Sequence, residues 1–112
     1  MSIKLTYVIK YVGDMEEAVR FCRDQLGLSL RFQSPGWSEF ETGETTLALH
    51  LSSQENPAGT YQLGFGVPDV DRFYTEKKDE GVEFTSAPSE TFGRRIARFK
   101  DSEGVVCSVS GE

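Results

Sequence analysis

His50 is the only histidine in this chain, and its side chain has the most versatile chemistry at neutral pH, because an imidazole can take up a proton, release one or bind a metal. It lies near the end of a strand-like run, residues 45–51. Two interpretations stay open. His50 is either a strand-end histidine that hydrogen-bonds a backbone group or water, or a histidine that binds a ligand or acts as a general base.

The other reactive side chains give little support for nucleophilic catalysis. Cys22 and Cys107 lie far apart, form no Cys-x-x-Cys pair and are best interpreted as small buried hydrophobic residues of a reduced, cytoplasmic protein. The sequence has no Gly-x-Ser-x-Gly motif and no glycine-rich phosphate loop before a helix. Glu39, Glu41 and Glu44 surround an expected β-hairpin, where we expect them to be exposed, and they show no paired geometry for acid/base chemistry.

The composition excludes some classes of partner. With 112 residues the chain is long enough for one domain, and its net charge of −6 argues against binding nucleic acid, whose phosphates require clusters of Lys and Arg. The sequence begins directly in a strand pattern, and no apolar stretch is long enough to cross a bilayer. We therefore expect neither nucleic acid nor membrane as a partner.

The clearest large-scale feature is an internal repeat. Residues 7–14 and 62–69 are both extended runs that end at an aspartate and turn helical. Each aspartate is followed by an amphipathic stretch that ends at Gly27 or Gly81, and then by strand-like residues. The first helical stretch is one residue longer than the second, a difference that we expect a helix end to absorb. Duplicated units of this kind form a cleft where they meet, and such clefts bind small molecules.

These patterns predict an α+β protein built from two βαβββ modules. The first module covers about residues 3–51, a polar linker covers 52–60, and the second module covers about 61–110. Asp14 and Asp69 are expected helix N-caps. We expect helices at 15–26 and 70–80, and strands at 3–12, 28–34, 37–42, 45–51, 61–67, 82–86, 92–100 and 105–110.

Several motifs resemble one known family. The segments 11–21, 26–27, 67–71 and 98–104 are similar to those of the glyoxalase, bleomycin-resistance and extradiol-dioxygenase superfamily, also called vicinal oxygen chelate. The resemblance covers essentially the whole chain. It implies two tandem modules that form a curled mixed sheet around a central cleft, and it implies a homodimer. The motifs are specific for the fold and not for an activity.

The resemblance also identifies the positions at which metal-using members place their ligands. Those positions are Tyr7, Gln62 and Ser108 here, and alignment on Gly43 puts the fourth at Leu47, which would leave His50 on the opposite face. None of the four is His, Asp, Glu or Cys, whose imidazole, carboxylate and thiolate groups are the side-chain donors that bind divalent metals tightly. We expect no metal and no other cofactor.

Alternation along the strands identifies further side chains of the cleft. Tyr7 shares its face with Ile9 and Tyr11, and the resemblance makes this the cleft face. Trp37 either covers the open end of the module or stacks on a flat ligand, and Phe92 lies in an expected loop at the rim. The predicted ligand-binding set is Tyr7, Trp37, His50, Gln62, Phe92, Arg98 and Ser108, where Arg98 shares a strand face with Arg94 and Ile96.

The sequence leaves three functions open. The first is a protein that binds a small planar organic molecule in a metal-free cleft, as the antibiotic-sequestering bleomycin-resistance proteins do. The second is an enzyme, a lyase or isomerase resembling glyoxalase I, with an altered metal set or with acid/base chemistry by His50 and Tyr7. The third is an accessory domain whose cleft is vestigial. Whether the protein is an enzyme stays open.

Overall fold

A computed structural model describes residues 2–91 and 93–111, and in it the chain divides into two compact units. We call residues 6–62 the first module. The second module consists of Leu63 onward together with the residues before Thr6. Each module is described by itself below. None of the helices in the described ranges is long and apolar enough to cross a bilayer.

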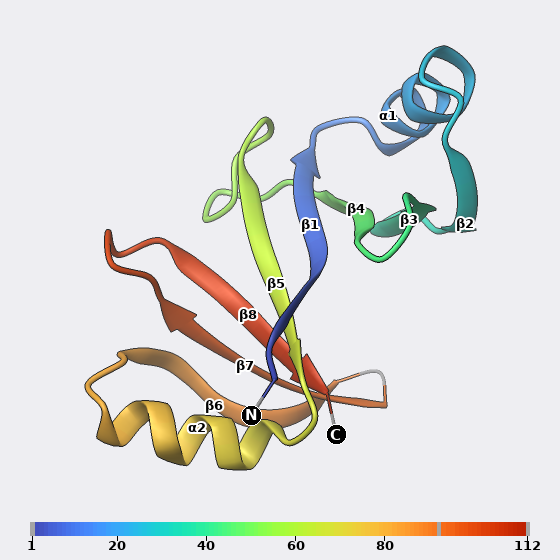
Figure 1. Ribbon diagram of the computed structural model, residues 1–112. Coiled ribbons are helices and arrows are strands. Elements are labelled where there is room, and N and C mark those ends of the chain that lie inside the picture. Colours follow the sequence, from blue (N-terminus) through green and yellow to red (C-terminus); the bar gives the residue numbers. More distant parts are fainter. Residues whose placement is uncertain (1, 92, 112) are drawn as a thin grey trace. The chain divides into compact units, whose positions relative to one another are not determined.

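The first module holds four strands in the order β2-β3-β4-β1 (Figure 1). Strand β1 pairs in parallel with β4, whereas β2–β3 and β3–β4 are antiparallel, so the sheet is mixed. The strands are β1 Lys4–Val12, β2 Ser29–Gln33, β3 Trp37–Glu41 and β4 Thr46–Leu51.

The helical segment of the first module changes its type along its length. Helix α1, Met15–Arg20, begins where Asp14 accepts a hydrogen bond from the Glu17 amide at 3.1 Å, which confirms the predicted N-cap. It continues as a π-helical segment, η1 Phe21–Gln25, in which the Leu26 amide donates to the Phe21 carbonyl, five residues earlier. The extra residue of this repeat is therefore taken up in the C-terminal part of the helical segment, in line with the expectation that a helix end absorbs it.

The core of the first module lies between this helical segment and one face of the sheet. Phe40 and Leu49 are fully buried there and pack with side chains of the helix. The buried cluster is Val12, Met15, Val19, Cys22, Phe40 and Leu49. Since strand side chains alternate in direction, the other face of the sheet carries the remaining residues of each strand.

The second module repeats this plan with the strand order β5-β8-β7-β6. Strand β5 is parallel to β8, and the β8–β7 and β7–β6 pairs are antiparallel. Asp69 accepts a hydrogen bond from the Arg72 amide at 3.0 Å and caps the helix, as predicted. The elements are β5 Tyr61–Val67, α2 Val70–Asp79, β6 Phe84–Thr91, β7 Arg94–Lys100 and β8 Val106–Gly111.

Helix α2 packs on one face of its own sheet (Figure 1). The buried cluster there is Val67, Val70, Phe73, Ala97 and Val109, with Phe65, Phe84 and Phe99 packed against it. Both modules are thus βαβββ units with mixed sheets, and the predicted α+β class is confirmed.

One predicted boundary is wrong. Residues 89–91 were expected in a loop, but β6 extends to Thr91, and Ser89, Glu90 and Thr91 pair with β7. The sequence was misleading because Pro88 interrupts the strand pattern. Strand β6 is the last in the strand order given above, so it pairs only with β7. Its register shifts between Ser86 and Ser89, around this proline, and edge strands tolerate proline at such irregularities. Phe92, predicted at the rim, lies outside the described residues.

Candidate functional site

The structure settles which way His50 faces. On β4 the fully buried Leu49 packs against the helical segment, and Leu47 joins the same core. Thr46, Ala48 and His50 therefore lie on the opposite face. This is the face of Tyr7 and Ile9, because Ile9 and Ala48 form a small buried cluster against which Tyr7 and Trp37 pack. Leu47, the position suggested by alignment on Gly43, is a core residue instead.

Four ring-bearing side chains gather on this face, and we call them the aromatic cluster: Tyr7, Tyr11, Trp37 and His50. Trp37 and His50 are direct Cα partners on β3 and β4, and His50 is the partner of Tyr11 on β1. The ring centroids are 6.1 Å apart for Tyr7 and Trp37, 5.8 Å for Trp37 and His50, and 5.2 Å for Tyr11 and His50. Tyr7, Trp37 and His50 belong to the predicted set, and the fold brings these three together.

His50 has a defined hydrogen bond. Its Nδ1 atom lies 2.7 Å from the Leu51 carbonyl oxygen. Because a carbonyl can only accept, Nδ1 carries the proton, and in a neutral imidazole Nε2 then keeps its lone pair. The ring is exposed. His50 is thus both a strand-end histidine bound to a backbone group and a ring that can accept a hydrogen bond from a ligand through Nε2.

The carboxylate of Glu39 borders the aromatic cluster, and the sequence did not identify it as part of the site. The indole nitrogen of Trp37 donates to Glu39 Oε2 at 2.8 Å, and Arg31 Nε lies 3.3 Å from Glu39 Oε1. Arg31 also donates to the Thr46 hydroxyl. The side chain of Glu39 is only 21% exposed, so the expectation that this carboxylate is exposed is wrong. The spacing of Glu39, two residues after Trp37 on one strand, was the available signal.

Arg98 and Ser108 of the predicted set are also neighbours, on the sheet of the second module. They are direct Cα partners on β7 and β8, and Gly64 is the partner of Ser108 on β5. Next to them, Arg94 Nη2 lies 3.4 Å from the Ser110 hydroxyl. Since Ala97 and Val109 face α2, this row lies on the sheet face away from that helix. Gln62 is buried on β5, two residues before Gly64 and so on the same side of the strand.

The donors at the family's metal positions do not fit a divalent metal. Tyr7 offers a phenol, Gln62 an amide oxygen and Ser108 a hydroxyl, and these neutral oxygens are weak ligands. Glu39 is already engaged by Trp37 and Arg31. Across residues 2–91 and 93–111, no three His, Cys, Asp or Glu side chains come together as a group that could hold an ion.

Comparison with known proteins gives a family for these modules. The model of the Glyoxalase/Bleomycin resistance protein/Dioxygenase superfamily matches residues 4–109. A relative from Bacillus subtilis (strain 168), the uncharacterized protein YraH, is 27% identical, and the match covers 90% of this chain and 92% of YraH.

Solved structures share the fold at lower identity. The hypothetical protein BH1468 from Bacillus halodurans C-125 matches with a TM-score of 0.83 and 22% identity, over 100% of this chain and 96% of its own. Methylmalonyl-CoA epimerase of Streptomyces coelicolor matches with a TM-score of 0.82 and 18% identity, over 97% of this chain and 96% of its own. At these identities the likeness concerns the fold, because one scaffold of this kind hosts several activities.

Proposed function

Because the chain belongs to the Glyoxalase/Bleomycin resistance protein/Dioxygenase superfamily, we propose that it binds a small planar organic molecule without a metal, in the manner of the antibiotic-sequestering members. The observation that carries this proposal is the aromatic cluster, in which Tyr7, Trp37 and His50 share one face of the first module. Aromatic side chains supply apolar area and ring contacts to a flat ligand.

The polar groups around the cluster narrow the kind of ligand. In the neutral imidazole of His50, Nε2 can accept a hydrogen bond from a ligand, because Nδ1 donates to the Leu51 carbonyl. A suitable ligand is therefore a flat ring system that carries an N–H or O–H group at its edge. Gln62, Arg98 and Ser108 stay proposed ligand contacts, from strands β5, β7 and β8.

The proposal also includes the oligomeric state of the protein and the compartment in which it acts. We propose a homodimer, the form that the superfamily resemblance implies, which light scattering on the purified protein would test. We also propose that the protein acts in the reduced cytoplasm, since Cys22 and Cys107 are free and buried.

An enzyme is the second candidate, and one observation favours it. With Nδ1 donating to a backbone carbonyl, the neutral imidazole of His50 keeps the lone pair of Nε2 on an exposed ring, which is the arrangement of a general base. A lyase or isomerase would use His50 with a phenol such as Tyr7, or an altered metal set that includes His50 and Gln62.

A thermal-shift screen tests the binding proposal. The panel contains planar compounds built on naphthol, quinoline, isoalloxazine and anthracycline ring systems, and the proteins are the wild type and Trp37→Ala. A ligand at 100 times its Kd stabilises the folded state by about 2.7 kcal/mol. We expect hits with the wild type that Trp37→Ala loses. No hit across the panel would favour a vestigial cleft.

Metal analysis separates the two candidates. Untagged protein, purified without chelators, is assayed for Ni, Zn, Fe and Mn. The binding proposal expects amounts far below one ion per chain. A stoichiometric ion would contradict it and would support the enzyme.

A further inference from the structure

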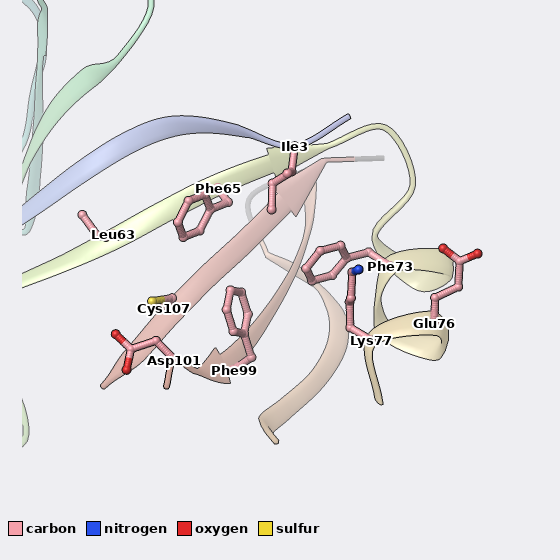
Figure 2. A pocket seen from close by; sticks show the side chains of 9 residues that line it. All are labelled: Ile3, Leu63, Phe65, Phe73, Glu76, Lys77, Phe99, Asp101 and Cys107. Atoms are coloured by element: carbon pink, nitrogen blue, oxygen red, sulfur yellow. The ribbon is translucent and has the colours of Figure 1, made fainter. Parts of the chain in front are cut away.

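The second module contains a cavity on the helix side of its sheet. Its volume is about 420 Å³, within the range of small-molecule sites. Its wall residues come from near the starts of β5 and β8, from β7, from α2 and from the N-terminal segment (Figure 2). They are Ile3, Leu63, Phe65, Phe73, Glu76, Lys77, Phe99, Asp101 and Cys107.

The inner wall of this cavity is aromatic. In Figure 2 the rings of Phe65, Phe73 and Phe99 surround the open space, with Cys107 beside them. Phe99 lies 6.2 Å from Phe65 and 5.9 Å from Phe73, centroid to centroid, with tilted planes. Burial raises the pKa of the Cys107 thiol, which agrees with an apolar wall and keeps the sulfur uncharged at neutral pH.

The charged side chains at the mouth already have partners within the module. Lys77 Nζ lies 3.3 Å from Glu80, and Glu76 lies 3.2 Å from Arg72 Nε. Asp101 Oδ1 accepts hydrogen bonds from two backbone amides of its own turn. Each charged side chain that lines the mouth therefore already has an ion-pair or hydrogen-bond partner, and the apolar interior behind it favours a neutral ligand, which loses less hydration on entry than an ion does.

From these observations we propose that the cavity is a binding site for a small neutral aromatic molecule. The site shares no residue with the aromatic cluster, which lies in the other module on the sheet face away from its helical segment. The ligand places its ring among Phe65, Phe73 and Phe99 and displaces water from apolar surface. The proposal is independent of the proposed function.

Fluorescence titration with the neutral aromatic dye N-phenyl-1-naphthylamine tests the site. Leu63 is 41% exposed at the mouth, so Leu63→Trp fills the opening without disturbing the buried core. Leu51, 42% exposed on β4 of the first module, gives the matched control Leu51→Trp. We expect Leu63→Trp to weaken dye binding at least tenfold, and Leu51→Trp and Trp37→Ala to leave it unchanged.

Two further measurements make the test specific. Displacement of the dye should be at least tenfold more efficient with 1-naphthalenemethanol than with the anion 1-naphthoate. The dye should also slow alkylation of Cys107 by N-ethylmaleimide, measured by mass spectrometry, while the buried Cys22 of the first module serves as the internal reference.

Three outcomes would overturn the proposal. Equal dye affinity for the wild type and Leu63→Trp would place the dye elsewhere, and loss of binding in Trp37→Ala would assign the dye to the aromatic cluster. An affinity that falls as protein concentration rises would show that a second copy of the chain covers the cavity.

Discussion

The rings of Trp37 and His50 stand at 90° to each other, with their centroids 5.8 Å apart. In this edge-on arrangement the positive edge of one ring meets the negative face of the other, which is a favoured aromatic geometry. Pairing of Trp37 with His50 across β3 and β4 maintains the contact. The indole is further held by its hydrogen bond to Glu39, so its position is fixed without a ligand, which would favour the binding proposed above.

Trp37→Ala should weaken binding of a planar ligand, taken as the compound with the largest thermal shift in the panel. Loss of a large aromatic contact costs roughly 1.5–3 kcal/mol, or more than tenfold in Kd. Isothermal titration calorimetry would measure it. Phe21→Ala is the control, because Phe21 is an exposed ring of the same module on η1. An equal loss in both variants would contradict a role for the aromatic cluster.

His50→Phe should distinguish the contribution of the aromatic ring of His50 to ligand binding from the contribution of its Nε2 hydrogen bond. The substitution keeps an aromatic side chain beside Trp37 and Tyr11 and removes the Nε2 acceptor. A ligand with an N–H or O–H at its edge should bind about fivefold to tenfold more weakly, since a hydrogen bond contributes about 1 kcal/mol. The O-methylated or N-methylated analogue of that ligand should bind both proteins equally. A uniform loss for both ligands would argue against the hydrogen bond.

Gly111→Ala should destabilise the fold strongly. Gly111 is the Cα partner of Val67 on β5, and a Cβ atom at this position would lie 2.0 Å from the Val67 carbonyl oxygen. The strands would have to separate, and we expect a loss of about 3 kcal/mol or more in the free energy of unfolding. Urea denaturation would measure it. Gly36→Ala, which meets no atom within 4 Å, should change stability by less than about 1 kcal/mol.

Asp71 should give a pH-dependent contribution to stability. Hydrogen bonds from the Arg95 guanidinium, at 2.9 and 3.0 Å, hold the pKa of the Asp71 carboxyl below its usual value. Because the folded pKa is the lower one, the stabilisation is present above the unfolded pKa of about 3.9 and is lost as the pH falls through the folded pKa. Asp71→Asn should therefore lower the Tm at pH 7, and the difference from the wild type should narrow towards pH 2.

The effect of Asp71→Asn should be small, since the pair is exposed and screened by solvent. Arg95→Gln should reproduce it, and the double variant should show no additional loss at pH 7. A Tm difference that does not change with pH would show that the carboxylate charge is not involved.

The repeat and its caps made most of the fold predictable. Asp14 and Asp69, each between a strand pattern and an amphipathic stretch, located the starts of the two helices. The end of β6 was not predictable, because Pro88 is a poor strand residue that this strand tolerates at a register shift.

The candidate site was only partly predictable. Tyr7 and Trp37 were expected near a ligand, and the structure adds that they contact each other. The direction of His50 depends on the register of β4 against β1 and β3, which is a long-range property that a one-residue slip would reverse. The role of Glu39 depends on Arg31, from a neighbouring strand with an irregular register at that point. The cavity of the second module arises from packing and has no sequence motif.

The widened turn of η1, where the Leu26 amide reaches the carbonyl of Phe21, also bears on the history of the duplication. An inserted amino acid in the middle of a strand would have turned every following side chain to the wrong face. Accommodated in a π-helical turn, the extra residue alters only that turn, and the strands that follow keep their pairing partners. Ancestral copies of one gene segment can in this way drift apart in length while the architecture that they share is preserved.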